Sequence, residues 1–142
     1  AYLLLQRSSR RPRASERARL DAGDGGRVLA LTCLHQAGRA SFCLEERLIS
    51  LATVPEAEAA DFAAGAPGPW LLARVPWVAA EHRIHATAAD AETAERLGLA
   101  PGSACLVVER RTWNREGPIT HARFTYPGER HSLVASFTPA GG

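Results

Sequence analysis

The chain has 142 residues, of which 46% are hydrophobic and 23% charged, and its formal net charge is +2. This length and composition fit one soluble globular domain and exclude a disordered chain. The nearly balanced charge argues against strong nucleic-acid binding by these residues themselves.

The chain contains no Met and opens directly on an apolar run, so we expect a fragment of a longer protein. No apolar stretch approaches the ~20 residues of a membrane helix, and no signal peptide is visible. The three cysteines are far apart and form no CxxC pair. We therefore expect a reduced, cytoplasmic protein with packed thiols, no metal site and no cofactor.

In chain order, the first third predicts a strand, a short helix and a hairpin. Residues 2–6 favour a strand, and the arginine-rich segment 7–19 favours a solvated loop that leads into a helix capped by Ser15. After a turn, the alternation of apolar and polar residues predicts a hairpin with strands over 27–35 and 42–50.

The remainder predicts three helices and four more strands. Thr53 and Glu56 form a capping-box pattern that predicts a helix over 54–64. Pro69 suits the first position of a short helix that ends before Pro76. The other expected elements are a strand from about 82, a helix over 90–98 with Asp90 as N-cap and Gly98 after its end, and strands over 104–113, 119–126 and 131–137.

The order of elements repeats at an offset of 77 residues. Segment 27–49 then matches 104–126, and Leu20 of one predicted helix matches Leu97 of the next. The duplication predicts an α+β fold with a mostly antiparallel sheet, pseudo-twofold symmetry and helices covering one face.

The strand over 42–50 carries charges in its centre. Glu45 and Arg47 share one face, because side chains alternate along a strand, and the same face of the preceding strand carries Cys33 and His35. A buried charge must be paired or hydrogen-bonded. Polar groups gathered on an apolar sheet face indicate a small-molecule pocket. The alternative is that Glu45 and Arg47 pair with each other on a solvent face.

Several segments carry a resemblance to a known family. VLALTCLHQAGRASFCLEERLI, PGPWLLARVPWVAAEHRIHA, LGLAPGSACLVVERRTW and TYPGERH resemble the UTRA effector-binding domain of GntR-type bacterial transcription regulators. The resemblance covers essentially the whole chain, and within the family it is strongest to the histidine-utilisation repressors.

The resemblance implies a fold similar to chorismate lyase and an effector-binding and dimerisation domain over residues 1–142. It also implies a homodimer, a winged helix-turn-helix domain outside this sequence that binds operator DNA, and urocanate as the effector. Candidate dimer interfaces are the exposed edge strand and the segment 70–77. Family members that bind sugar phosphates have basic residues where this chain has Cys33 and His35, which favours a smaller, less charged ligand.

The resemblance further implies which residues form the site. The acidic residue of the family's site matches Glu45, and the aromatic residue of its last hairpin matches Tyr126. A second acidic residue of the family would fall near Thr120, so this chain does not have it. Backbone N–H groups at the start of the helix near Pro69 are expected to meet the ligand. The candidate ligand-binding residues are Cys33, His35, Glu45, Arg47, Pro69, Trp70, Leu71, Thr120 and Tyr126.

Urocanate fits this chemistry. A helix N-terminus favours its carboxylate, and Glu45 can accept an imidazole N–H in a charge-assisted bond. His35 and Tyr126 would orient the ring, while Arg47 either supports Glu45 or meets the carboxylate. We expect no catalytic residue. The alternatives are a chorismate-lyase-like enzyme, a domain that senses another metabolite such as a sugar phosphate, and a dimerisation module without a ligand.

Overall fold

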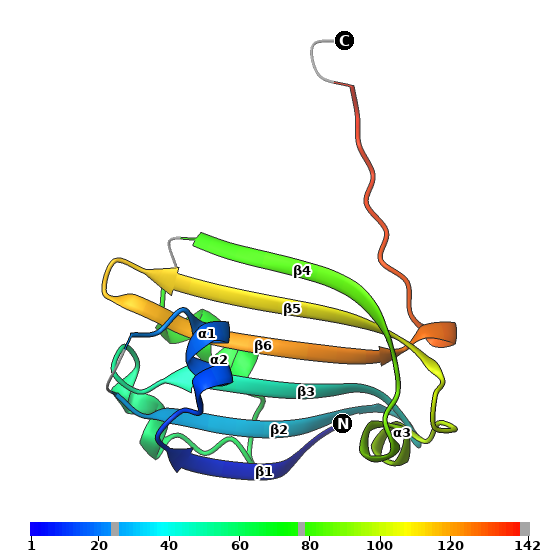
Figure 1. Ribbon diagram of the computed structural model, residues 1–142, viewed down its shortest axis with the longest axis horizontal. Helices are drawn as coiled ribbons and strands as arrows, with labels where there is room; N and C mark the ends of the chain where they lie inside the picture. Colours follow the sequence, from blue (N-terminus) through cyan, green and yellow to red (C-terminus); the bar gives the residue numbers. More distant parts are fainter. Residues whose placement is uncertain (24–25, 77–78, 140–142) are drawn as a thin grey trace.

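The structure is a computed structural model that describes residues 1–23, 26–76 and 79–139. Its centre is a six-stranded antiparallel sheet in the order β1-β2-β3-β6-β5-β4 (Figure 1). The strands are β1 (Tyr2–Arg10), β2 (Val28–Ala37), β3 (Ala40–Ser50), β4 (Ala79–Ala88), β5 (Ala104–Asn114) and β6 (Gly117–Pro127). The α-helices are α1 (Ala14–Leu20), α2 (Pro67–Arg74) and α3 (Ala91–Leu97), and the 3-10 helices are η1 (Pro55–Ala59) and η2 (Gly128–Arg130).

The fold consists of two copies of one unit, a strand, a helix and a long hairpin. Adding the predicted 77-residue offset to α1 gives the bounds of α3, and adding it to β3 gives the bounds of β6. The two units meet where β3 pairs antiparallel with β6. The α+β class, the antiparallel sheet and the internal repeat are therefore confirmed.

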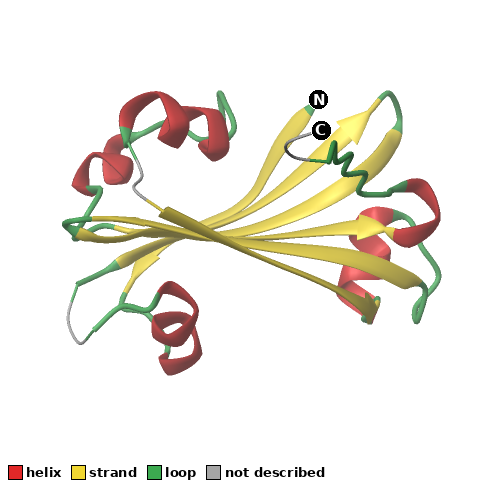
Figure 2. Ribbon diagram, turned by 90° about the horizontal axis from the view of Figure 1, so that it is seen from above, coloured by secondary structure: helices red, strands yellow, loops and turns green. Residues whose placement is uncertain are grey.

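The sheet has two faces, and each carries its own core. Face A is the face of Leu29, Leu31 and Ile49, which pack with residues of η1 and α2. Face B is the opposite face, where Leu48 packs on Leu20 of α1 and Leu44 packs on Leu97 of α3. Figure 2 shows the helical segments on both sides of the sheet.

The prediction that helices cover one face is therefore wrong. β2 and β3 carry apolar residues on both of their faces: Leu29 and Leu31 lie on face A, and Val28 and Leu34 on face B. A strand that is apolar on both faces needs a packing layer on each.

Three predicted helices differ from the structure in their start, type or length. α1 begins after Arg13, whose backbone N–H donates to Glu16 Oε1 at 2.8 Å, so Ser15 lies inside the helix instead of capping it. The helix expected over 54–64 is only the 3-10 turn η1, because the Asp61 carboxylate accepts from Ala63 and Ala64 N–H and closes a separate turn. α2 begins at Pro67, two residues before Pro69.

The helix predicted over 90–98 is confirmed. The Asp90 side chain accepts a hydrogen bond from Thr93 N–H at 2.8 Å, and Gly98 adopts the left-handed conformation after the last helical residue, with φ of 66°. No helix among the described residues is long and apolar enough to cross a membrane.

The last predicted strand, 131–137, does not form one here. Residues 131–139 leave η2 as an extended segment with no strand partner among the described residues, and they project away from the sheet (Figure 1). The Trp77 end of the interface candidate 70–77 lies outside the described residues.

Candidate functional site

A chain of polar side chains crosses face A at the junction of the two repeats. His35 Nε2–H donates to Glu45 Oε1 at 2.8 Å, and Arg47 Nε–H donates to Glu45 Oε2 at 2.6 Å. Arg47 Nη1 then reaches Thr120 Oγ1 at 3.3 Å, and the Thr120 hydroxyl donates to the backbone carbonyl of Leu48 at 2.7 Å. Strand register brings these groups together, since β2 and β6 are the two neighbours of β3.

The ion pair at the centre of this chain is buried. Glu45 is 2% exposed and Arg47 is 7% exposed. Burial raises the pKa of the Glu45 carboxyl, but the hydrogen bond from His35 and the charge of Arg47 lower it more, so its pKa lies below the ordinary value. Glu45 is therefore ionised near neutral pH. The alternative of a solvent-face pair is wrong, because both side chains are buried.

A cavity of about 380 Å³ opens on the far side of Arg47 from Glu45. Its apolar wall is formed by α2 and by Phe124, over which the Arg47 guanidinium lies at 5.7 Å. Its polar positions come from Arg47, Arg110, Thr112 and Thr120. Glu45 is not among the residues that line it, so Arg47 is the charged group of the buried pair that the cavity reaches.

The start of α2 forms part of the cavity wall. Ala66 is the N-cap, and positions one and three of the helix are Pro67 and Pro69, which have no N–H. Gly68, between them, has an N–H without an intrahelical partner. A methyl group added to Gly68 would lie 3.5 Å from Arg47 Nη2. Gly68 and the Arg47 guanidinium therefore lie side by side in the cavity wall.

The structure brings some of the predicted site residues to the cavity. Arg47, Thr120, Pro69 and Leu71 line it. His35 and Glu45 lie behind Arg47 in the polar chain.

Three other candidates lie elsewhere. Trp70 packs against Phe62 with ring centroids 5.3 Å apart, Cys33 is buried beside the Tyr2 hydroxyl at 3.3 Å, and the Tyr126 ring stacks on His131 at 3.7 Å. Cys33 thus belongs to the core instead of the cavity surface.

Sequence reasoning missed several lining residues, among them Gly68, Arg110 and Phe124. The alternation of Pro67 and Pro69 around a glycine was the available signal for Gly68. Arg110 lies in the same row across face A as Arg47, because β6 pairs Ala122 with both. That register could be found only once the order of the strands was known.

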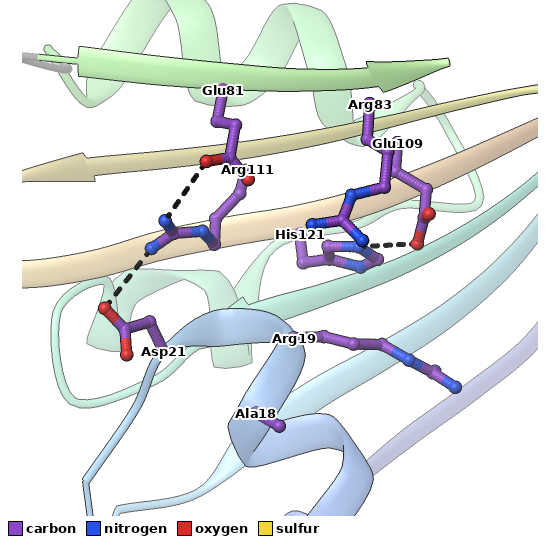
Figure 3. A pocket seen from close by; sticks show the side chains of 8 residues that line it. All are labelled: Ala18, Arg19, Asp21, Glu81, Arg83, Glu109, Arg111 and His121. Carbon is purple, nitrogen blue, oxygen red and sulfur yellow. Dashed lines mark hydrogen bonds and ion pairs between the residues drawn. The ribbon is translucent and has the colours of Figure 1, made fainter. Parts of the chain in front are cut away.

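A larger cavity, of about 510 Å³, lies on face B (Figure 3). Arg111 lies 3.5 Å from Asp21 and 3.9 Å from Glu81, and His121 Nε2 lies 3.2 Å from Glu109. The described lining has three arginines and three carboxylates, so its charges largely compensate one another. Burial lowers the pKa of His121 against the opposing charge of Glu109. The described lining of the face A cavity has arginine but no carboxylate, so that cavity is the better candidate for a small anionic ligand.

Among the described residues, no group of three or more His, Cys, Asp or Glu side chains is placed to hold a metal ion. The three thiols are free and buried, as expected for packed cysteines. Burial raises the pKa of Cys33 to about 11 and that of Cys43 to about 12.

Comparison with known proteins identifies the family. The model of the UTRA domain matches residues 1–132. The chain belongs to the UTRA domain family. This UTRA domain is 34% identical to the histidine utilization repressor of Pseudomonas putida over 125 residues, which cover 87% of this chain and 50% of that protein. It is 30% identical to the Klebsiella aerogenes repressor of the same name over 83% of this chain and 49% of that protein. The chain thus spans about half the length of the curated relatives it matches.

Solved structures support the same assignment. The UTRA domain matches the C-terminal domain of the histidine utilization repressor from Pseudomonas syringae pv. tomato with a TM-score of 0.88 and 28% identity, covering 97% of this chain and 98% of that one. The effector domain of PhnF from Mycobacterium smegmatis matches with a TM-score of 0.85 at 17% identity, over 97% of this chain and 86% of that one, which is a likeness of fold alone. The predicted fold, similar to chorismate lyase, and the family resemblance are therefore both confirmed.

Proposed function

We propose that this UTRA domain binds urocanate in the face A cavity and thereby controls operator-DNA binding by a winged helix-turn-helix domain of a longer, dimeric repressor of histidine utilisation. The observation that carries the proposal is the position of Arg47, which is held by buried Glu45 and faces a cavity beside Gly68. The similarity to three histidine utilization repressors supports histidine utilisation as the regulated pathway.

The carboxylate of urocanate is the part that fits Arg47. The guanidinium supplies donors to the cavity, the Gly68 N–H would add a further donor beside it, and a helix N-terminus adds partial positive charge. Both oxygens of Glu45 already accept hydrogen bonds, so Glu45 acts first as the group that fixes Arg47. Arg47 therefore binds the urocanate carboxylate, and Glu45 holds Arg47 in place.

The remainder of urocanate is a flat conjugated chain that ends in an imidazole. Phe124 and Leu71 supply apolar walls for a planar group, and a volume of about 380 Å³ lies within the range of small-ligand sites. We place the imidazole beside Phe124 in the apolar part of the cavity, because His35 and Glu45 lie behind Arg47 and do not line it. Histidine would bring an ammonium group near Arg47, and this like-charge contact disfavours it.

Ligand binding would act on DNA through a difference in affinity between two states of the dimer. A coupling free energy of about 1–3 kcal/mol is enough for regulation of this kind. No step of this function needs a catalytic residue.

Thermal melting of the chain tests the proposal. Urocanate at ~100 times its dissociation constant should stabilise the domain by ~2.7 kcal/mol, a shift of several degrees for a domain of this size. Histidine, N-acetylglucosamine 6-phosphate and chorismate serve as comparison ligands. A shift with the phosphosugar alone would keep the family and reject urocanate. Conversion of chorismate to 4-hydroxybenzoate, followed by absorbance, would reveal an enzyme instead.

A further inference from the structure

The two repeats differ in how face A is covered. In the first repeat, Leu29 is 0% exposed, because Val54 and Phe62 in the chain that follows β3 pack over it. The equivalent residue of the second repeat, Leu106, is only partly buried, and so is its neighbour Val108. Apolar surface thus remains open on the second half of face A.

This open strip consists of Ile84 on β4, Leu106 and Val108 on β5 and Phe124 on β6. Ile84, Val108 and Phe124 are direct neighbours across the three strands, and Ile84 is 54% exposed. A contiguous apolar strip left in water is typical of an interaction surface.

The segment after the second repeat is apolar but covers nothing. Residues 131–139 correspond at the 77-residue offset to 54–62, the segment that covers the first repeat. Leu133, Val134 and Phe137 are all exposed, Phe137 by 90%, and the segment extends away from the body (Figure 1). Its start is held by the stacking of His131 on Tyr126.

We propose that residues 133–137 of one chain pack over the open strip of a second copy, and that the second copy returns the same contact. The chain carries both complementary surfaces, and a reciprocal exchange closes into a twofold dimer. Segment 133–137 contains no charged residue, which suits an apolar strip. Five extended residues reach about 16 Å, more than the roughly 10 Å that separates β4 from β6.

A second copy is favoured over the chain's own strip because the segment points away from its own sheet (Figure 1). The outer edge of β4 pairs with no strand among the described residues, so a second chain can approach the strip from that side. The inference rests on the dimer of the proposed function and deepens it, and the strip shares Phe124 with the effector cavity.

Sedimentation equilibrium of the chain and three variants tests the proposal. Phe137→Asp alters the segment, Ile84→Asp alters the strip, and Leu5→Asp is the control on β1 at the opposite edge of the sheet. All three side chains are exposed, so the fold should persist, and circular dichroism checks it. We expect a dimer for the unchanged chain and for Leu5→Asp, and a dissociation constant raised about tenfold or more by the other two.

Amide hydrogen exchange of residues 133–137 distinguishes the two possible locations of the segment. Protection that appears only at protein concentrations where the dimer forms supports exchange between chains. Protection in the monomer would overturn it in favour of the chain's own strip, and an unprotected segment in a dimer would place the interface elsewhere. If Phe137→Asp no longer dimerises but urocanate still raises its melting temperature, loss of the dimer contact does not imply loss of the effector pocket.

Discussion

Glu46 on β3 and Arg123 on β6 are Cα partners at the centre of the sheet, and they occupy equivalent positions of the two repeats, 77 residues apart. The pseudo-twofold axis therefore passes between them, perpendicular to the sheet. One residue away on each strand, Glu45 and Ala122 are also equivalent, but only Glu45 carries a charge. The sheet is symmetric, but the charged part of the polar chain, Glu45 and Arg47, lies on one side of the axis, and only Thr120 joins it from the other repeat.

Gly68→Ala should weaken urocanate binding without harming the fold. The added methyl group would occupy the space between α2 and Arg47, where the ligand carboxylate is expected, and would lie at ordinary contact distance from Arg47 Nη2. We expect binding to weaken by about 1.5–3 kcal/mol, the range for a hydrogen bond to a charged group. Alanine in a helix stabilises by up to ~1 kcal/mol relative to glycine, so the melting temperature without ligand should not fall.

Isothermal titration with urocanate measures the effect, and Gly65→Ala is the matched control, because a methyl group there meets nothing within 4 Å. If Gly68→Ala and Gly65→Ala bound urocanate with equal affinity, the urocanate carboxylate would not lie at the start of α2.

Glu45→Gln should lower both stability and ligand affinity. The neutral amide of this variant cannot balance the charge of Arg47, which is 7% exposed, and a buried charge without its partner costs about 3–5 kcal/mol. Binding should weaken by roughly 1.5–3 kcal/mol as Arg47 loses its fixed position. Denaturant unfolding measures the first effect and titration the second.

Glu46→Gln is the control for Glu45→Gln, since Glu46 is the adjacent residue, is exposed and lies on face B. Its stability should change by no more than ~0.5 kcal/mol. If Glu45→Gln behaved like Glu46→Gln, the buried pair would have no structural role.

Acid should destabilise the domain through Glu16. The Arg10 guanidinium donates two hydrogen bonds to the Glu16 carboxylate, at 2.6 and 2.8 Å, and holds its pKa at about 2. The pKa is lowered in the folded state, so the stabilisation is fully present above about pH 4.5, the unfolded value, and is lost as the pH falls toward 2. The loss should be on the order of 2–3 kcal/mol, since Arg10 is partly exposed.

Urea unfolding across this pH range, with Glu16→Gln beside the unchanged chain, measures that loss. The variant should lack most of the dependence. Glu92→Gln, which removes the exposed pair of Glu92 with Arg96, is the control and should change stability by at most ~0.5 kcal/mol. If the stability of Glu16→Gln fell with pH as steeply as that of the unchanged chain, groups other than Glu16 would control the acid transition.

The three thiols should resist alkylation in the folded protein. Cys33, Cys43 and Cys105 are buried, and with a pKa of about 11 the Cys33 thiol is about 0.1% ionised at pH 8. Mass spectrometry after iodoacetamide treatment should find no modification without denaturant and three modified cysteines with it. Rapid labelling of Cys33 in the native protein would indicate that the first-repeat core opens.

The sequence alone determined the features that depend on neighbours along the chain. The 77-residue repeat, both hairpins and the caps of α3 at Asp90 and Gly98 were predictable, because turns, caps and strand alternation are local. The sequence also showed that a buried Glu45 would need a partner, because an unpaired buried charge is costly, but it left two roles open for Arg47.

Only the tertiary structure decided which groups meet across the sheet and over it. Strand order placed Arg47 beside Thr120, and the path of the chain after β3 placed Gly68 next to Arg47. The start of α2 could not be read locally, since Pro67 and Pro69 suit the first helical turn equally well. Packing between distant segments selected one of them and placed Gly68 in the cavity wall.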